Sequence, residues 1–131
     1  MVLQRVTVEG YESLLSELGK CSYRTLILFT ASKNSGKSWC PDCVEAEPAI
    51  ENVLKDVQSS SYAEDNNLRV IECFVGQREY WKDKQNPFRT DPKFSVSCIP
   101  TLMEYGAKSK RLSEAQLRKE DLIRELIECE D

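Results

Sequence analysis

The chain alternates between short apolar runs and segments in which apolar residues recur every three or four positions. The short runs over 25–30, 68–75 and 99–105 predict strands, because they are too short for a stable helix. Residues 4–8 predict a further short strand, because polar and apolar residues alternate there. The helical spacing predicts amphipathic helices over 10–19, from Pro41 and from Arg118. We expect an edge strand over 108–116, loops over 32–38 and 58–67, and loops with a short helix over 76–93.

The helix that begins at Pro41 has the clearest pattern. Its apolar stripe consists of Ala46, Ile50, Val53, Leu54 and Val57. Pro41 suits the first helical position, because the N–H that proline lacks would have no partner there. Pro48 lies inside the helix and should kink it, since it removes a backbone donor.

The last helix has two possible starting points. Its apolar face consists of Leu122, Ile123, Leu126 and Ile127, which favours a start near Arg118. A rival start is Ser113, because Gln116 follows at the spacing of a capping box. In either case the element order, βαβ followed by αββα, predicts an α/β fold with a central mixed sheet and helices on both faces, in a single domain over 1–131.

The composition is that of an ordinary globular protein. The chain has 131 residues, of which 40% are hydrophobic and 31% are charged, with a net charge of −4. A mildly acidic domain without a basic stripe is a poor candidate for binding nucleic acid or an anionic membrane. No segment approaches the roughly 20 apolar residues of a membrane span, and the first residues lack the apolar run of a signal peptide. We therefore expect a cytoplasmic protein.

Six cysteines and no histidine narrow the chemistry. The missing histidine excludes Cys–His and Ser–His catalytic pairs and any zinc site with an imidazole ligand. A zinc site made of four cysteines needs two close pairs, and only one pair is close in the sequence. The other cysteines stand singly, at Cys21, Cys73, Cys98 and Cys129. Because cytosolic thiols stay reduced, we expect the close pair to be catalytic, with no metal bound.

The close pair lies in Trp39-Cys40-Pro41-Asp42-Cys43, directly after a buried strand and at the start of the clearest helix. Cys40 would lie near the N-cap, where unpaired N–H groups and the helix dipole stabilise a thiolate. Cys43 would lie on the first turn, where we expect it to be more covered. Cys40 is therefore the candidate nucleophile, and Cys43 the candidate resolving thiol that attacks the mixed disulfide.

The neighbours of the two thiols are candidates for tuning their reactivity. Asp42 favours the helix start but opposes a thiolate on Cys40, and Lys37 could offset that charge if its loop lies close. Pro41 begins the helix. Trp39 either shapes a substrate platform or only packs.

Three further positions leave alternatives open. Trp81 and Phe88 stand in a charged loop, where they either pin the loop or form a partner surface. Cys98 stands two positions before Pro100 and is either a third redox thiol or a bystander. Cys73 is expected in the core.

The chain resembles the thioredoxin family in a strand followed by Trp39-Cys40-x-x-Cys43, a proline at position 48 and a later Ile99-Pro100-Thr101. More narrowly, it is similar to small cytosolic thioredoxin-related members with a Cys-Pro-Asp-Cys centre. The residues that carry this narrower resemblance are 29–30, 36–43, 46–48, 80–83, 88–89 and 100–102. The resemblance implies the thioredoxin fold, a cis peptide bond at Pro100 and substrate docking on the backbone of Ile99.

The resemblance also implies a function. It is that of a protein-disulfide and cystine reductase, which thioredoxin reductase recharges with electrons from NADPH and which needs no bound cofactor. Members of this branch are also linked to peroxide removal, to denitrosylation and to a dynein light chain in cytokine signalling. An alternative is a binding module in which the Cys40–Cys43 pair is a redox switch without turnover.

Two departures from ordinary thioredoxins bear on these expectations. Ordinary thioredoxins have a buried aspartate on the strand before the cysteines, and 26–29 contains no acid. The chain also has extra length in 32–38 and between Cys40 and Pro100. Because both additions should flank the cysteines and narrow access, we expect small or exposed disulfides as substrates.

Overall fold

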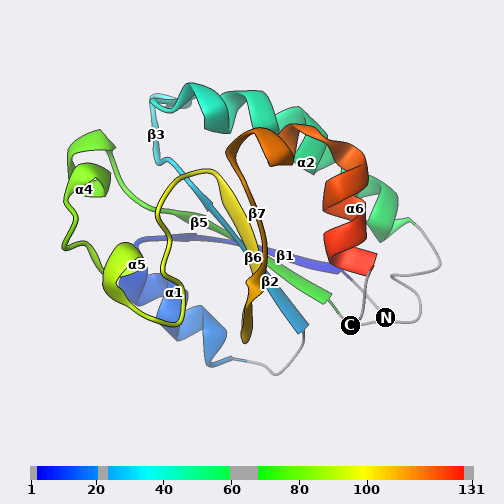
Figure 1. Cartoon of the computed structure of the whole chain (residues 1–131), viewed down its shortest axis with the longest axis horizontal. Coiled ribbons are helices and arrows are strands. Elements are labelled where there is room, and N and C mark those ends of the chain that lie inside the picture. The colour runs from blue at the N-terminus through cyan, green and yellow to red at the C-terminus, as the bar shows by residue number, and fades with distance from the viewer. Residues whose placement is uncertain (1–2, 21–23, 60–67, 129–131) are drawn as a thin grey trace.

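The computed structural model describes residues 3–20, 24–59 and 68–128 and has a central five-stranded sheet (Figure 1). Its strand order is β1-β5-β2-β6-β7, with bounds Leu3–Glu9, Leu68–Phe74, Arg24–Thr30, Thr101–Glu104 and Ala107–Ser113. Strands β1, β5 and β2 are parallel, whereas β6 and β7 run antiparallel to their neighbours. The predicted mixed sheet is therefore confirmed.

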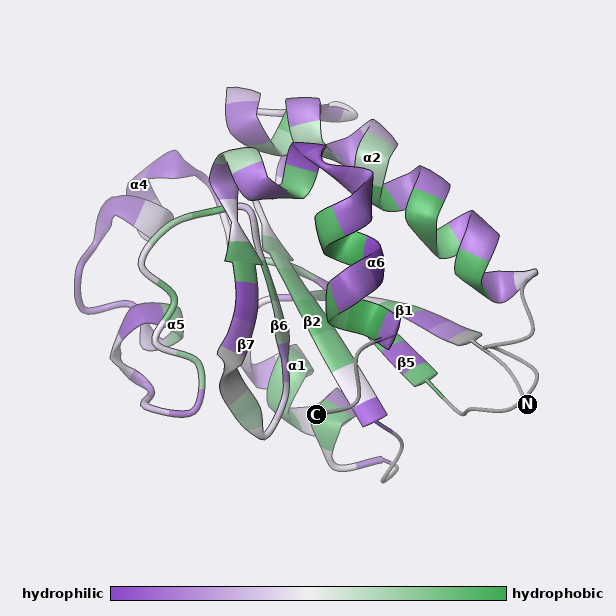
Figure 2. Ribbon diagram, turned by 45° about the vertical axis from the view of Figure 1, so that its right-hand side comes forward, coloured by the Kyte–Doolittle hydropathy of each residue, from purple (hydrophilic) through white to green (hydrophobic). Residues whose placement is uncertain are grey.

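Helices cover both faces of this sheet. Helix α2 (Pro41–Gln58), the short 3₁₀ helix η1 (Glu114–Arg118) and α6 (Glu120–Glu128) pack on one face. Helices α1 (Tyr11–Leu18), α4 (Arg78–Lys82) and α5 (Pro87–Thr90) contribute to the core on the other face. Figure 2 shows the mainly hydrophobic strand β2 between these two layers.

Strand β2 shows why its sequence is a continuous apolar run. Leu26 and Leu28 belong to the core under α2 and α6, whereas Ile27 and Phe29 belong to the opposite core. Successive side chains of a strand point to opposite faces, so a strand buried on both sides is apolar at every position. Helix α2 is continuous across the exposed Pro48, and the kink predicted there stays a prediction.

Several boundaries differ from those predicted. The expected loop over 32–38 contains a small hairpin, β3 (Lys33–Asn34) and β4 (Lys37–Ser38), whose turn residues Ser35 and Gly36 both have positive φ. The segment after β5 forms two short helices instead of one. The edge strand ends at Ser113, where the capping box with Gln116 is present but begins η1, while the last α-helix begins later.

The segment that carries α4 and α5 is pinned to the sheet by aromatic side chains. Trp81 and Phe88 are buried, so the packing alternative for these two residues is confirmed. Phe88 makes edge contacts with Phe29 of β2 and Tyr11 of α1. The Tyr11 hydroxyl also donates a hydrogen bond to the carboxylate of Asp91, at 2.5 Å. These contacts hold the segment that leads toward Pro100.

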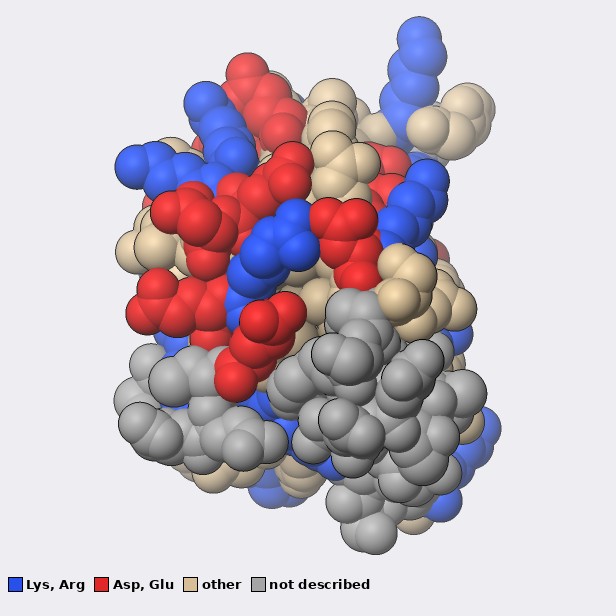
Figure 3. All heavy atoms as spheres, turned by 90° about the vertical axis from the view of Figure 1, so that its right-hand side faces the viewer, with Lys and Arg blue, Asp and Glu red and all other residues tan. Residues whose placement is uncertain are grey.

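Acidic side chains gather on the face formed by the end of α2 and by α6 (Figure 3). Arg124 of α6 lies between two of them, with a guanidinium nitrogen 2.5 Å from Asp56 and 3.6 Å from Glu120. The acidic side chains on this face are thus partly neutralised by the local ion pairs of Arg124.

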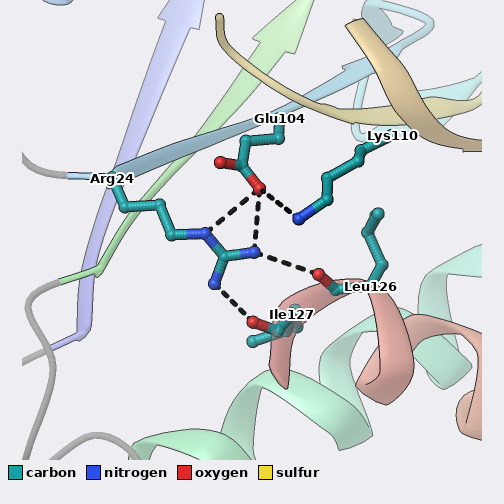
Figure 4. A network of polar contacts seen from close by, with 5 residues as sticks. All are labelled: Arg24, Glu104, Lys110, Leu126 and Ile127. Carbon is teal, nitrogen blue, oxygen red and sulfur yellow. Dashed lines mark hydrogen bonds and ion pairs between the residues drawn. The ribbon is translucent and has the colours of Figure 1, made fainter. Parts of the chain in front are cut away.

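Arg24 joins the start of β2 to the end of α6 (Figure 4). Its guanidinium donates to Glu104 at 2.9 and 3.1 Å, to the carbonyl oxygen of Leu126 at 3.0 Å and to that of Ile127. Lys110 lies 3.9 Å from the same carboxylate. The last carbonyl groups of a helix have no partner within the helix, so a cation at that position stabilises the helix end.

Candidate active site

Cys40 lies at the N-cap of α2, as its place in the sequence predicts. Its sulfur accepts a hydrogen bond from the backbone N–H of Cys43 at 3.3 Å, and its own N–H donates to the Ser38 hydroxyl at 3.2 Å. A sulfur in this position receives an unpaired N–H of the helix start and the favourable end of the helix dipole. The sulfur of Cys40 thus lies directly at the start of α2, with a backbone N–H of the first turn directed at it.

The two cysteines are almost equally covered, so the structure shows hardly any of the expected difference. Cys40 is 6% exposed and Cys43 is 5% exposed, and both are free thiols. Burial raises the pKa of Cys43 to about 12, and a hydrogen bond between the two cysteine side chains raises it further. Hydrogen bonds from the Thr30 side chain and the Ala31 backbone act in the opposite direction and lower this pKa. Cys43 is thus a protonated thiol near neutral pH.

The residues before β6 lie against the first thiol. The Ile99–Pro100 peptide bond is cis, as the family resemblance implies. The carbonyl oxygen of Ile99 lies 4.0 Å from the sulfur of Cys40, and both Ile99 and Pro100 are buried. Cys98 is partly exposed, and the hydroxyl of Thr101 donates to its carbonyl oxygen at 2.7 Å. Substrate docking on Ile99 stays a prediction.

Trp39 is held from two sides. Its indole N–H donates to the carbonyl oxygen of Gly76 at 3.0 Å. The guanidinium of Arg78 lies 5.3 Å from the centre of the ring and donates to the Trp39 carbonyl oxygen at 3.1 Å. Trp39 is half-buried and packs on the core that includes Cys40, and its role in a substrate platform stays a prediction.

The cation beside Asp42 is Arg118, which the sequence pattern did not single out. The Arg118 guanidinium lies 3.4 Å from the Asp42 carboxylate and 2.5 Å from that of Glu45. Lys37, the cation we expected to offset Asp42, is exposed on β4, and no ion pair joins it to Asp42 in the described part of the chain. No local signal could have identified Arg118, because it is 76 residues from Asp42.

A cavity of about 410 Å³ lies between α2 and the sheet, behind the cysteines. Its lining includes Cys43, Thr30 and Pro100 at one side and the Arg5–Glu51 ion pair at another. Glu72 of β5 also lines it, half-buried. Burial raises the pKa of Glu72; Lys33 and Arg5 oppose this shift, whereas Glu47 and Glu51 add to it. The only sequence signal for this residue is an acid inside the apolar run 68–75.

The remaining cysteines of the described residues, Cys73 and Cys98, are free thiols. Cys73 is buried in β5, as predicted, and burial followed by the charge of Glu9 raises its pKa to about 12. Cys21 and Cys129 lie outside the described residues. Within 3–20, 24–59 and 68–128, no group of three or more His, Cys, Asp or Glu side chains is arranged to hold a metal ion.

Within the described part of the chain, no helix combines the length and the apolar character needed to cross a bilayer.

The dithiol at a helix start beside a cis-proline, on a mixed sheet covered on both faces, defines a protein of the thioredoxin class. Solved structures agree on the fold. Thioredoxin O1 from Arabidopsis thaliana in its oxidised state superposes with a TM-score of 0.56 at 20% identity, over 93% of this chain and 96% of that one. Chloroplastic thioredoxin z gives a TM-score of 0.54 at 17% identity, over 97% of this chain and 94% of that one.

The chain belongs to the thioredoxin domain-containing protein 17-like family, whose thioredoxin-domain model matches residues 5–129. It is 37% identical to thioredoxin domain-containing protein 17 from Homo sapiens, over 98% of this chain and 97% of the human protein. It is also 32% identical to the thioredoxin-like protein Clot from Oryza sativa subsp. japonica, over 75% of this chain and 71% of that protein. The narrower resemblance found in the sequence is therefore confirmed.

Proposed function

We propose that this protein is a thiol-disulfide oxidoreductase that reduces cystine and exposed disulfides of proteins. The observation that carries the proposal is the Cys40 sulfur at the N-cap of α2, which accepts the N–H of Cys43 and lies beside the cis Ile99–Pro100 bond. Membership of a thioredoxin-like family supports a redox role for this pair.

The reaction has two exchange steps. The Cys40 thiolate attacks one sulfur of the substrate disulfide, a mixed disulfide forms, and the first substrate thiolate leaves. Cys43 then loses its proton and attacks the Cys40 sulfur, which releases the second substrate thiolate and forms the Cys40–Cys43 disulfide. Two electrons pass from the dithiol to the substrate. Thioredoxin reductase with NADPH is the proposed source of the electrons that restore the dithiol, which fits a cytoplasmic setting.

Access to Cys40 supports small or exposed disulfides as substrates. The sulfur belongs to a residue that is 6% exposed. The β3–β4 hairpin precedes Trp39 directly, and the segment around Arg78 is fixed against Trp39. A substrate must therefore present its disulfide in a narrow space, which cystine or a disulfide on a protruding loop does more easily than a disulfide on a broad flat surface.

Turnover in the presence of thioredoxin reductase tests the proposal. We expect the full chain to oxidise many equivalents of NADPH with cystine, fewer with insulin, and none after Cys40→Ser. Cys73→Ser is the matched control, because Cys73 is buried in β5, and it should retain the activity. Oxidation of a single equivalent of NADPH would contradict the proposal and favour the redox-switch alternative, in which the pair changes state without turnover.

A further inference from the structure

The cavity behind the active cysteines contains one acidic group that no contact accounts for. Three carboxylates line the cavity, and two of them are paired: Glu51 with Arg5 at 2.8 Å and Glu47 with Lys33 at 3.5 Å. Among the described residues, none forms a hydrogen bond or ion pair with Glu72. A half-buried acid without a partner lowers the stability of the folded protein. Such an acid in a cavity is a candidate functional group.

The register of the sheet directs Glu72 toward α2. In β5 it lies opposite Leu28 of β2 on one side and Thr7 of β1 on the other. Leu28 belongs to the core under α2, and partners in register point to the same face of a sheet. Glu72 therefore lies on the face that the helix of Cys43 covers.

Cys43 and Glu72 line the same cavity, and Thr30 lines it with them. The Thr30 side chain hydrogen-bonds to Cys43 in the sense that favours the thiolate. The cavity has a volume of about 410 Å³, which is many times the roughly 30 Å³ that one water molecule occupies in the liquid. Solvent in this space can thus connect the thiol of Cys43 to the carboxylate of Glu72.

The second exchange step needs such a connection. Burial holds the pKa of Cys43 at about 12, so few molecules carry a Cys43 thiolate near neutral pH. Burial also raises the pKa of Glu72, with Lys33 and Arg5 opposing and Glu47 and Glu51 adding to this shift. A base whose affinity for protons is raised toward the working pH transfers a proton more effectively than an ordinary carboxylate.

We propose that Glu72 accepts the proton of the Cys43 thiol through solvent in the cavity that both residues line, as Cys43 attacks the mixed disulfide. This inference rests on the proposed reductase function. In the step the Cys43 S–H bond breaks and Glu72 becomes protonated. The Cys40–Cys43 S–S bond forms, the bond from Cys40 to the substrate sulfur breaks, and the substrate leaves as a thiolate. The proton on Glu72 then returns to solvent at the Arg5–Glu51 side of the cavity.

The two exchange steps can be followed separately with the aromatic disulfide DTNB, whose thiolate product is coloured. Half an equivalent of DTNB mixed with the reduced full chain should release coloured thiolate in two phases, the first from attack by Cys40 and the second from resolution by Cys43. Cys40→Ser should lose the fast first phase, and Cys43→Ser should retain it and lose the second.

Glu72→Gln should leave the first phase unchanged and slow the second roughly 10- to 100-fold at pH 7. The gap should narrow at higher pH, where hydroxide deprotonates Cys43 directly. The matched control is Glu47→Gln, which removes another carboxylate of the same cavity. Because Glu47 makes only a minor contribution to the raised pKa of Glu72, and burial makes the main one, this variant should leave the first phase unchanged and slow the second by no more than about 2-fold.

An unchanged second phase in Glu72→Gln, or equal slowing in Glu47→Gln, would overturn the role of Glu72. The absence of both phases in the unmodified chain would instead overturn the proposed function. A measurement without substitution covers the case in which Glu72→Gln does not fold. In the unmodified chain the rate of the second phase should level off as Glu72 ionises, and a steady tenfold rise per pH unit from about pH 5 to 9 would exclude this base.

Discussion

At the scale of single residues, the reactivity of the site depends on which charges lie beside each sulfur. Cys40 is at the N-cap of α2, and Asp42 lies in the first turn of the same helix. Arg118 compensates Asp42 and Glu45 together. The charge of Asp42 is therefore offset by a residue of η1, not by Lys37 of the loop before the cysteines.

Arg118→Gln should make Cys40 less reactive, because it leaves two carboxylates uncompensated near the thiolate. We expect the rate of alkylation by iodoacetamide at neutral pH and low salt to fall about 2- to 5-fold, a small effect since the charges are solvent-exposed. The difference should shrink at high salt, where such charges are screened.

Arg124→Gln is the matched control for this prediction. Arg124 also bridges two carboxylates, those of Asp56 near the end of α2 and Glu120 at the start of α6. It should leave the alkylation rate unchanged. Equal slowing in both variants would show that Arg118 acts through general charge and not through Asp42 and Glu45.

At the scale of secondary-structure elements, the ends of helices are tied to distant strands. Helix α2 is positioned by its apolar face, but α6 is also held by the Arg24 guanidinium at its last carbonyl groups (Figure 4). Because η1 precedes α6 and carries Arg118, the docking of α6 also affects where Arg118 lies relative to Asp42.

Arg24→Met should lower the free energy of unfolding by about 2 kcal/mol, because it leaves Glu104 and the carbonyl oxygens at the end of α6 with fewer partners. Arg5→Met removes a more exposed ion pair with Glu51 and should cost less than about 1 kcal/mol. Urea denaturation of both variants measures the difference, and equal losses would contradict a special role for the Arg24 network.

At the scale of the whole molecule, we expect the cavity under α2 to lower the stability of the fold while it supports the reactivity of Cys43. A packed core would exclude both the space and the acid that lie behind Cys43. The sign of the effect of Glu72 on the free energy of unfolding can be predicted. The folded state raises the pKa of Glu72, mainly through burial, so the folded protein binds this proton more tightly than the unfolded chain does.

Glu72→Gln should therefore stabilise the protein near pH 7, because it removes a carboxylate that is less favourable in the folded state than in the unfolded chain. The gain in melting temperature should decrease as the pH falls toward 4, where Glu72 of the unmodified protein becomes protonated in both states. A lower melting temperature at pH 7 would show that the ionised carboxylate contributes to stability.

The sequence by itself determined the main strands and helices and the position of the reactive pair, but not the β3–β4 hairpin or the two short helices after β5. Strands and helices follow from periodicity, which is a local property of the chain. The N-cap sulfur of Cys40 and its contact with Cys43 lie within one helical turn, so the spacing was enough to predict them. The thioredoxin-like family was also recognisable from these local motifs and is shown by the comparison.

Only the tertiary structure decided what surrounds that pair. Arg118 meets Asp42 across 76 residues, and Glu72 shares a cavity with Cys43 because parallel β5 and β2 lie in a particular register. The nearly equal cover of Cys40 and Cys43 likewise depends on how the helix packs against the sheet. Burial, long-range charge and the space left between layers arise from packing among distant segments, and a local pattern of residues does not specify that packing.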